Sequence, residues 1–244
     1  MAIDWVFIAL VAGSFIAAAF NAAFSIGGAM IVLAITTTVL PVSAVVPLHS
    51  GLLLGSTLGR IWLFRQFMQH KIVVPFLVGS FFGTALGART YVELSDDVIA
   101  IAIGIVMLVA IWLPDIAWRP KLKHPWVIVG FVHSLFSTMF AYGALLHSVI
   151  LHSGLNRRQI VATMAGCLAG MSVFKIAGYA WFGFDFAPYV IVIVASILAS
   201  FLGTWVGKRL SEQLPEQSFR LIYRVLITLT AVRLLYTALF GNNM

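Results

Sequence analysis

Long apolar runs recur along this chain from Trp5 to the C-terminus, and no polar stretch between them is long enough to form a soluble domain. A run of about 18 or more apolar residues can cross the hydrocarbon core of a bilayer as a helix. The composition agrees, because only 9% of the residues are charged, whereas soluble domains carry about 25%. The sequence therefore predicts an all-α polytopic membrane protein.

Ten helical segments are predicted, separated by polar or proline-containing breaks. They cover residues 4–24, 27–40, 43–65, 72–92, 96–114, 125–140, 142–155, 158–181, 187–208 and 217–240. The second and seventh are about 14 residues long, and at 1.5 Å per residue this is about 21 Å, less than a hydrocarbon core of about 30 Å. We expect these two segments to be short broken or re-entrant helices.

The two halves of the sequence carry an internal repeat. At an offset of about 115 residues, Gly28, Gly51, Gly55 and Arg60 align with Gly143, Gly166, Gly170 and Lys175. At an offset of about 120, "GTALGAR" at 83–89 aligns with "GTWVGKR" at 203–209. Glycine is common in membrane helices, so chance recurrence is the alternative. The repeat predicts an N-terminal half at 1–114, a linker at 115–124 and a C-terminal half at 125–244, and the i,i+4 glycines indicate close helix packing.

Loop charge favours inverted repeats of about five segments each. If 4–40 and 125–155 are both hairpins, nearly all basic loop residues share one side, which the positive-inside rule assigns to the cytoplasm. These residues are Arg65, Lys71, Arg119, Lys121, Lys123, Arg157, Arg158, Lys208 and Arg209. The linker is then cytoplasmic and both termini face outward, in a bacterial inner membrane. The net charge of +7 is explained by these loops, without a nucleic acid partner.

Two helix breaks are candidate substrate sites. Gly27 and Gly28 form the tip of the first hairpin, flanked by Asn21 and Ser25, and Tyr142 and Gly143 form the second. A helix that starts at such a tip has free backbone N–H groups and binds anions readily. Irregular backbone is tolerated in a membrane when protein buries it or a watery cavity faces it. The alternative is an ordinary tight turn at each tip.

The placement of charge favours an anionic substrate. All acidic residues lie at segment ends or in loops, whereas a cation transporter normally carries an intramembrane carboxylate. Arg60 and Lys175 lie inside apolar segments with no carboxylate nearby in sequence, so we expect them to bind the anion. The alternative is that their long side chains snorkel to the headgroups.

Histidines supply candidates for proton coupling. His133 and His147 lie on either side of the second tip, where His133 can face the short arm, and histidine titrates near neutral pH. His49 and Ser50 are expected to border the cavity at the first tip. The histidines fit no compact metal motif, so no metal and no cofactor is predicted.

Several ordered motifs resemble the sulfite exporter TauE/SafE family, also called the toluene-sulfonate uptake permease family. They are "SIGGAMIVLAI", "LPVSAVVPLHSGLLLGSTLGRI" and "GSFFGTALGA" in the first half, and "GLNRRQIVATMAGCLAGMSVFKIAGY" and "ASFLGTWVGKRL" in the second. The first break departs from the family's longer glycine run, since Ala29 takes one of those places. The resemblance implies export or uptake of small sulfur oxyanions or organosulfonates, such as sulfite, thiosulfate or sulfoacetate.

The sequence thus predicts a secondary transporter of small anions that works by alternating access, with proton coupling as a hypothesis. Three alternatives stay open: a metal-dependent intramembrane enzyme, a non-transporting subunit of a membrane complex, and a channel.

Overall fold

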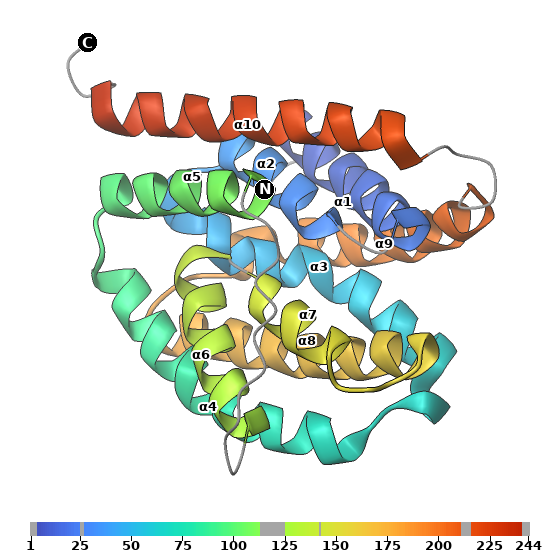
Figure 1. Ribbon diagram of the computed structural model, residues 1–244. Coiled ribbons are helices and arrows are strands. Elements are labelled where there is room, and N and C mark those ends of the chain that lie inside the picture. Colours follow the sequence, from blue (N-terminus) through green and yellow to red (C-terminus); the bar gives the residue numbers. More distant parts are fainter. Residues whose placement is uncertain (1–3, 25–26, 113–124, 142, 211–215, 241–244) are drawn as a thin grey trace. The chain divides into compact units, whose positions relative to one another are not determined.

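A computed structural model describes residues 4–24, 27–112, 125–141, 143–210 and 216–240 (Figure 1). Within these residues the chain forms ten α-helices and two short 3-10 helices. They are α1 (Trp5–Phe24), α2 (Gly28–Val39), α3 (Val42–Phe64), η1 (Arg65–Phe67), α4 (His70–Glu93), α5 (Asp96–Trp112), α6 (Pro125–Phe140), α7 (Ala144–Leu151), α8 (Arg157–Trp181), η2 (Ala187–Tyr189), α9 (Val190–Leu210) and α10 (Glu216–Phe240). The ten predicted segments are confirmed in number and order.

The helix lengths agree with the predicted membrane protein. Among the described residues, five helical stretches are long and apolar enough to cross a bilayer: Trp5–Ala22, Val42–Phe67, His70–Glu93, Arg157–Trp181 and Ala187–Gly207. The two segments predicted to be short are short, because α2 has 12 residues and α7 has 8. The end of α7 was predicted too late, at 155, whereas the helix stops at Leu151 and a turn follows.

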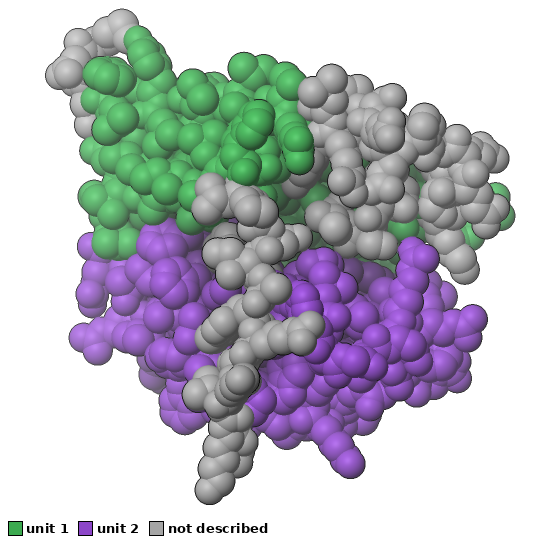
Figure 2. Space-filling view, viewed as in Figure 1, with its two compact units in different colours: residues 1–56, 94–113, 185–244 green, residues 57–93, 114–184 purple. Residues whose placement is uncertain are grey.

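The chain divides into two compact units (Figure 2). Unit 1 contains residues 1–56, 94–113 and 185–244, and unit 2 contains residues 57–93 and 114–184. Each unit draws helices from both halves of the sequence, since α4 belongs to unit 2 and α9 to unit 1. The predicted division at 1–114 and 125–244 is therefore a division of the sequence and not of these packing units. The predicted linker at 115–124 lies outside the described residues.

In unit 2, α4 and α6 pack with their backbones nearly in contact (Figure 1). A Cβ atom added to Gly79 would lie 1.9 Å from the carbonyl oxygen of Val127, and one added to Gly83 would lie 2.2 Å from that of Phe131. Gly130 meets the carbonyl oxygen of Phe76 from the other side, at 2.1 Å. Small residues at such positions let membrane helices approach closely.

Unit 1 repeats this arrangement between α1 and α9. A Cβ atom at Gly203 would lie 2.3 Å from the carbonyl oxygen of Phe15, and one at Gly207 would lie 2.1 Å from that of Ala19. Gly55 meets the backbone of Ile197 at 2.7 Å. The interpretation of the glycines as helix-packing positions is confirmed.

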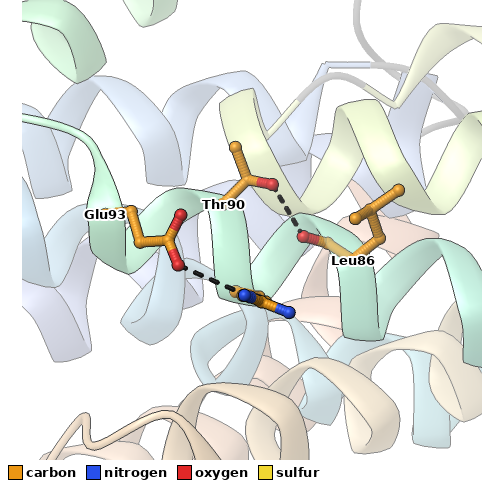
Figure 3. Close-up of polar contacts among 4 residues, drawn as sticks. Leu86, Thr90 and Glu93 are labelled. Atoms are coloured by element: carbon orange, nitrogen blue, oxygen red, sulfur yellow. Dashed lines mark hydrogen bonds and ion pairs between the residues drawn. The ribbon is translucent and has the colours of Figure 1, made fainter.

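Acidic side chains lie at helix ends in the described part of the chain. Glu93 is the last residue of α4 and pairs with exposed Arg89 at 3.4 Å, while Thr90 donates a hydrogen bond to the carbonyl oxygen of Leu86 (Figure 3). An exposed pair of this kind contributes about 0–1 kcal/mol. The remaining described acidic side chains are Asp4, Asp96, Asp97 and Asp185, all at helix starts or in connections.

The α4–α6 contact makes a prediction about stability. Gly83→Ala is expected to destabilise the protein by about 1–3 kcal/mol, because the added methyl group meets backbone that cannot rotate away. Gly143→Ala is the matched control, since nothing lies within 4 Å of its Cβ position. Thermal unfolding in detergent should show a lower melting temperature for the first variant and no change for the second. Equal melting temperatures would contradict the close approach.

Candidate functional site

The hairpin between α6 and α7 in unit 2 is the first candidate site. The helix α6 ends at Phe140, and Ala141 adopts a left-handed φ of 56° before α7 begins. A helix ends with carbonyl groups that lack partners within the helix, and the next begins with N–H groups that lack them. The break therefore brings a partially negative helix end and a partially positive one into the same turn.

Lys175 on α8 binds the C-terminal end of α6. Its side chain is 2% exposed, and its ammonium donates to the carbonyl oxygen of Ser137 at 2.6 Å and to the Ser137 hydroxyl at 2.9 Å. One turn later on α8, the hydroxyl of Tyr179 donates to the carbonyl oxygen of Thr138. A cation at a helix C-terminus is electrostatically favourable. Lys175 is therefore held in place inside unit 2, and the snorkelling alternative for this residue is wrong.

The buried charge of Lys175 has no acidic partner in the part of the chain that the structure describes. The ion pair found there is between Arg89 and Glu93. An ammonium group has three N–H donors, and the bonds to Ser137 account for two of them. Buried charges are normally paired or fully hydrogen-bonded, and the third N–H of this ammonium can still donate to a further acceptor.

His133 on α6 lies opposite the start of α7, as the sequence predicts. It is fully buried, and its Nδ1 accepts the backbone N–H of Leu146, the third residue of α7, at 3.2 Å. A neutral imidazole that accepts at Nδ1 carries its proton at Nε2. That Nε2 is buried and has no hydrogen-bond partner among the described residues. The His133 Nε2 is therefore a buried N–H donor without an acceptor among the described residues.

Hydroxyl side chains continue this polar region along the α4–α6 contact. Ser134 donates to the Ser80 hydroxyl at 2.6 Å. The buried hydroxyls of Thr84 and Thr138 have no partner within the described ranges. Sequence reasoning missed these residues and Ser137. The signal was present, since Ser80 and Thr84 on α4, and Ser134 and Thr138 on α6, are both spaced by i,i+4.

The remaining predicted site residues of unit 2 that the structure describes are more exposed than Lys175 and His133. Gly143 is exposed directly before α7, with φ −113°, and His147 is half-buried on α7. Arg60 is half-buried in the part of α3 that belongs to unit 2. Tyr142 lies outside the described residues.

The second candidate site is the break between α1 and α2 in unit 1. Gly27 has a left-handed φ of 97°, which favours glycine, and its carbonyl oxygen accepts the N–H groups of Met30 and Ile31. A Cβ atom at Gly28 would lie 2.5 Å from the carbonyl oxygen of Ala17, so this position also requires glycine. The predicted tip at Gly27 and Gly28 is confirmed as a helix break, and Ser25 lies outside the described residues.

A small cavity lies beside this break. It has about 10 Å³ for the centre of a water molecule, which is room for about one water. Its polar lining is Ser14, Asn21, Ser56 and Ser200, with Gly28 at its edge. His49 and Ser50 do not line it: the His49 Nε2 lies 2.9 Å from the carbonyl oxygen of Ala29, and Ser50 donates to that of Val46.

Metal-binding side chains do not cluster in the described residues. No three of the histidine, cysteine, aspartate and glutamate side chains there are close enough to hold a metal ion. The lone cysteine, Cys167, is buried among apolar side chains of unit 2 such as Val73 and Met171.

Comparison with known families identifies the chain. A family model described as "Sulfite exporter TauE/SafE" matches residues 10–234, nearly the full length. No curated protein and no solved structure matches the chain. The match excludes the enzyme alternative, because this family consists of transporters. This chain, with its membrane-spanning helices and its two helix breaks, belongs to the TauE/SafE family of membrane transporters.

Proposed function

We propose that this protein is a secondary transporter of small sulfur oxyanions or organosulfonates, of the sulfite, thiosulfate or sulfoacetate type, in a bacterial inner membrane. The observation that carries the proposal is the buried ammonium of Lys175, which lies at a helix break without a carboxylate partner in the described residues. The family description, sulfite export, agrees with an anionic substrate.

The α6–α7 break offers three kinds of group to an oxyanion. The start of α7 carries the positive end of a helix dipole, His133 supplies a buried donor at Nε2, and Lys175 supplies a full charge. Each group favours an oxygen acceptor with negative charge and disfavours a cation. We propose that Gly143, Tyr142, His147 and Arg60 complete this site.

Equivalent contacts in the two units support the predicted internal repeat. Gly83 meets the carbonyl oxygen of Phe131, and Gly203 meets that of Phe15, in both cases with a hypothetical Cβ at 2.2–2.3 Å. Ser80 donates to the carbonyl oxygen of Gly130 at 3.5 Å, and Ser200 donates to that of Ser14 at 3.4 Å. Offsets of about 120 for α4 onto α9 and about 116 for α1 onto α6 relate both pairs.

The contacts of α3 with α9 and of α8 with α4 are also equivalent under the repeat. Gly51 and Gly55 on α3 contact Ile193 and Ile197 on α9, and their aligned residues Gly166 and Gly170 on α8 contact Val73 and Leu77 on α4. The repeat supports the inverted topology that loop charge favours, in which alternating access comes from rocking one part of the protein against the other around a central site.

The repeat also supports one of the two helix breaks as the substrate site. At the offset of about 116, Ala17, Ala18 and Asn21 of unit 1 align with His133, Ser134 and Ser137 of unit 2. The unit 1 break thus has alanine where unit 2 has the buried side chains of His133 and Ser134, and its cavity has room for about one water. We propose that the unit 2 break supplies most of the binding energy, and that Asn21, Gly27 and Gly28 supply weaker contacts.

Flux through purified protein tests this function. Proteoliposomes loaded with sulfite are expected to exchange it for labelled external sulfite, with competition from thiosulfate and sulfoacetate and little from taurine or acetate. Exchange by the protein alone would exclude a non-transporting subunit, and saturation without single-channel conductance would exclude a channel. Absence of exchange with every sulfur anion would contradict the proposed function.

Proton coupling makes a separate prediction. Replacing both His133 and His147 by asparagine should leave the residual transport rate independent of pH, because the two imidazoles proposed to carry the coupling protons at the α6–α7 break are then removed. The control is His152→Asn. His152 is exposed, and its Nδ1 lies 2.8 Å from the carbonyl oxygen of Ser148. The measurement is the initial transport rate of each variant between about pH 5 and 8. An unchanged pH profile in the double variant would exclude these histidines as coupling groups.

A further inference from the structure

The contacts of Lys175 have the form of a cation site. Its ammonium is bound by two oxygens of one residue, the carbonyl and hydroxyl of Ser137, at the C-terminal end of α6. In transporters with broken helices, such carbonyl-rich helix ends coordinate the coupling Na⁺ or H⁺. The carbonyl oxygen of the neighbouring Thr138 accepts the hydroxyl of Tyr179, so a second carbonyl oxygen of the same helix end faces α8.

We propose that Lys175 is a tethered cation that permanently fills a Na⁺-type site at the end of α6. Removing its side chain to the β-carbon is then expected to leave a vacant site that binds a free alkali-metal ion. The proposal concerns the cation at this break, whereas the proposed function concerns the anion, so it goes beyond that function and does not depend on the identity of the substrate.

Electrostatics favour a cation at this position without any carboxylate. The last turn of a helix carries roughly half a negative charge, and here two α8 side chains, Lys175 and Tyr179, both donate to carbonyl groups of α6. In the described residues no acidic side chain forms a salt bridge with Lys175. The helix end is therefore the negative partner of the ammonium, and it persists when the ammonium is removed.

The tethered cation has a consequence for coupling. A free Na⁺ can enter and leave with each cycle, whereas Lys175 cannot leave. Transport by the natural protein should therefore be indifferent to Na⁺, and its driving force should come from the anion gradient or from protons. Replacement of Na⁺ by N-methyl-D-glucamine is expected to leave the rate of the natural protein unchanged.

Thermal unfolding of Lys175→Ala tests the vacant site. The melting temperature is measured in NaCl and in N-methyl-D-glucamine chloride at equal ionic strength. We expect saturable stabilisation of Lys175→Ala by Na⁺, with a rise of about 5 °C at saturation, and no difference for the natural protein. Lys175→Met is the matched control, because it removes the charge yet fills the space, and it should not respond to Na⁺.

Equal melting temperatures of Lys175→Ala in the two salts would overturn the inference. If that variant is too unstable to purify, Lys175→Ser is measured instead, since it leaves similar space and the same prediction applies. Sulfite added to the natural protein in the same assay keeps the two proposals apart. A Na⁺ response in the variant without a sulfite response in the natural protein would support the tethered cation and count against the anion site, and the reverse pattern would do the opposite.

Discussion

Replacing Lys175 by alanine is expected to reduce sulfite exchange in sodium-free proteoliposomes by at least about a hundredfold. Lys175 lies on α8, and its buried ammonium binds the last turn of α6, directly before the α6–α7 break. The ammonium and a bound sulfite would form a buried charge pair. Removing one partner of such a pair costs about 3–5 kcal/mol, and about 1.4 kcal/mol corresponds to a factor of ten. The measurement is the initial exchange rate per folded protein.

Lys71→Ala is the matched control for this prediction, because Lys71 has the same charge but is exposed on the first turn of α4. Its exchange rate should stay within about twofold of the natural protein, as an exposed charge is screened by solvent. Lys175→Arg is expected to recover little, because the planar guanidinium does not reproduce the compact contacts to Ser137. Natural exchange rates in folded Lys175→Ala would exclude this ammonium as the anion's partner.

Replacing His133 is expected to separate the support of α7 from the binding of the anion. In His133→Ala the N–H of Leu146 loses its acceptor, and a buried unsatisfied amide costs about 1–3 kcal/mol. His133→Asn places an oxygen near the Nδ1 position and removes the donor at Nε2. The alanine variant should therefore lose both stability and exchange, whereas the asparagine variant should keep its melting temperature and lose about tenfold or more in exchange.

The control for these variants is His152→Ala, which changes an exposed histidine outside the α6–α7 break. Its melting temperature and exchange rate should both match those of the natural protein. If His133→Asn transports at the natural rate, Nε2 is not a ligand of the anion, and His133 serves only to hold the start of α7.

Local features of the sequence were sufficient to predict the helices and the breaks. Apolar runs and their polar interruptions set the ten segments, and Gly27 and Gly28 mark a turn that requires glycine at both positions. The placement of acidic residues at segment ends could also be predicted from the sequence, because a carboxylate in the hydrocarbon region is energetically costly.

The partners across the fold could not be predicted in the same way. Lys175 binds Ser137 from another helix, and the grouping of α4 with α6, and of α9 with α1, exchanges helices between the two halves of the sequence. Such pairings depend on which faces meet in three dimensions, and glycine is common on many faces of membrane helices. His133 was predicted to face α7, but its role as acceptor for Leu146 required the geometry of the break.

The most direct test is to locate the anion. Selenite is the selenium analogue of sulfite, and an experimental structure of the natural protein in selenite would mark the bound anion by its anomalous scattering. We expect one selenium peak at the start of α7, within contact of Lys175 or His133. A peak confined to surface arginines, or at another place in the membrane region with this break empty, would exclude the α6–α7 break as the substrate site.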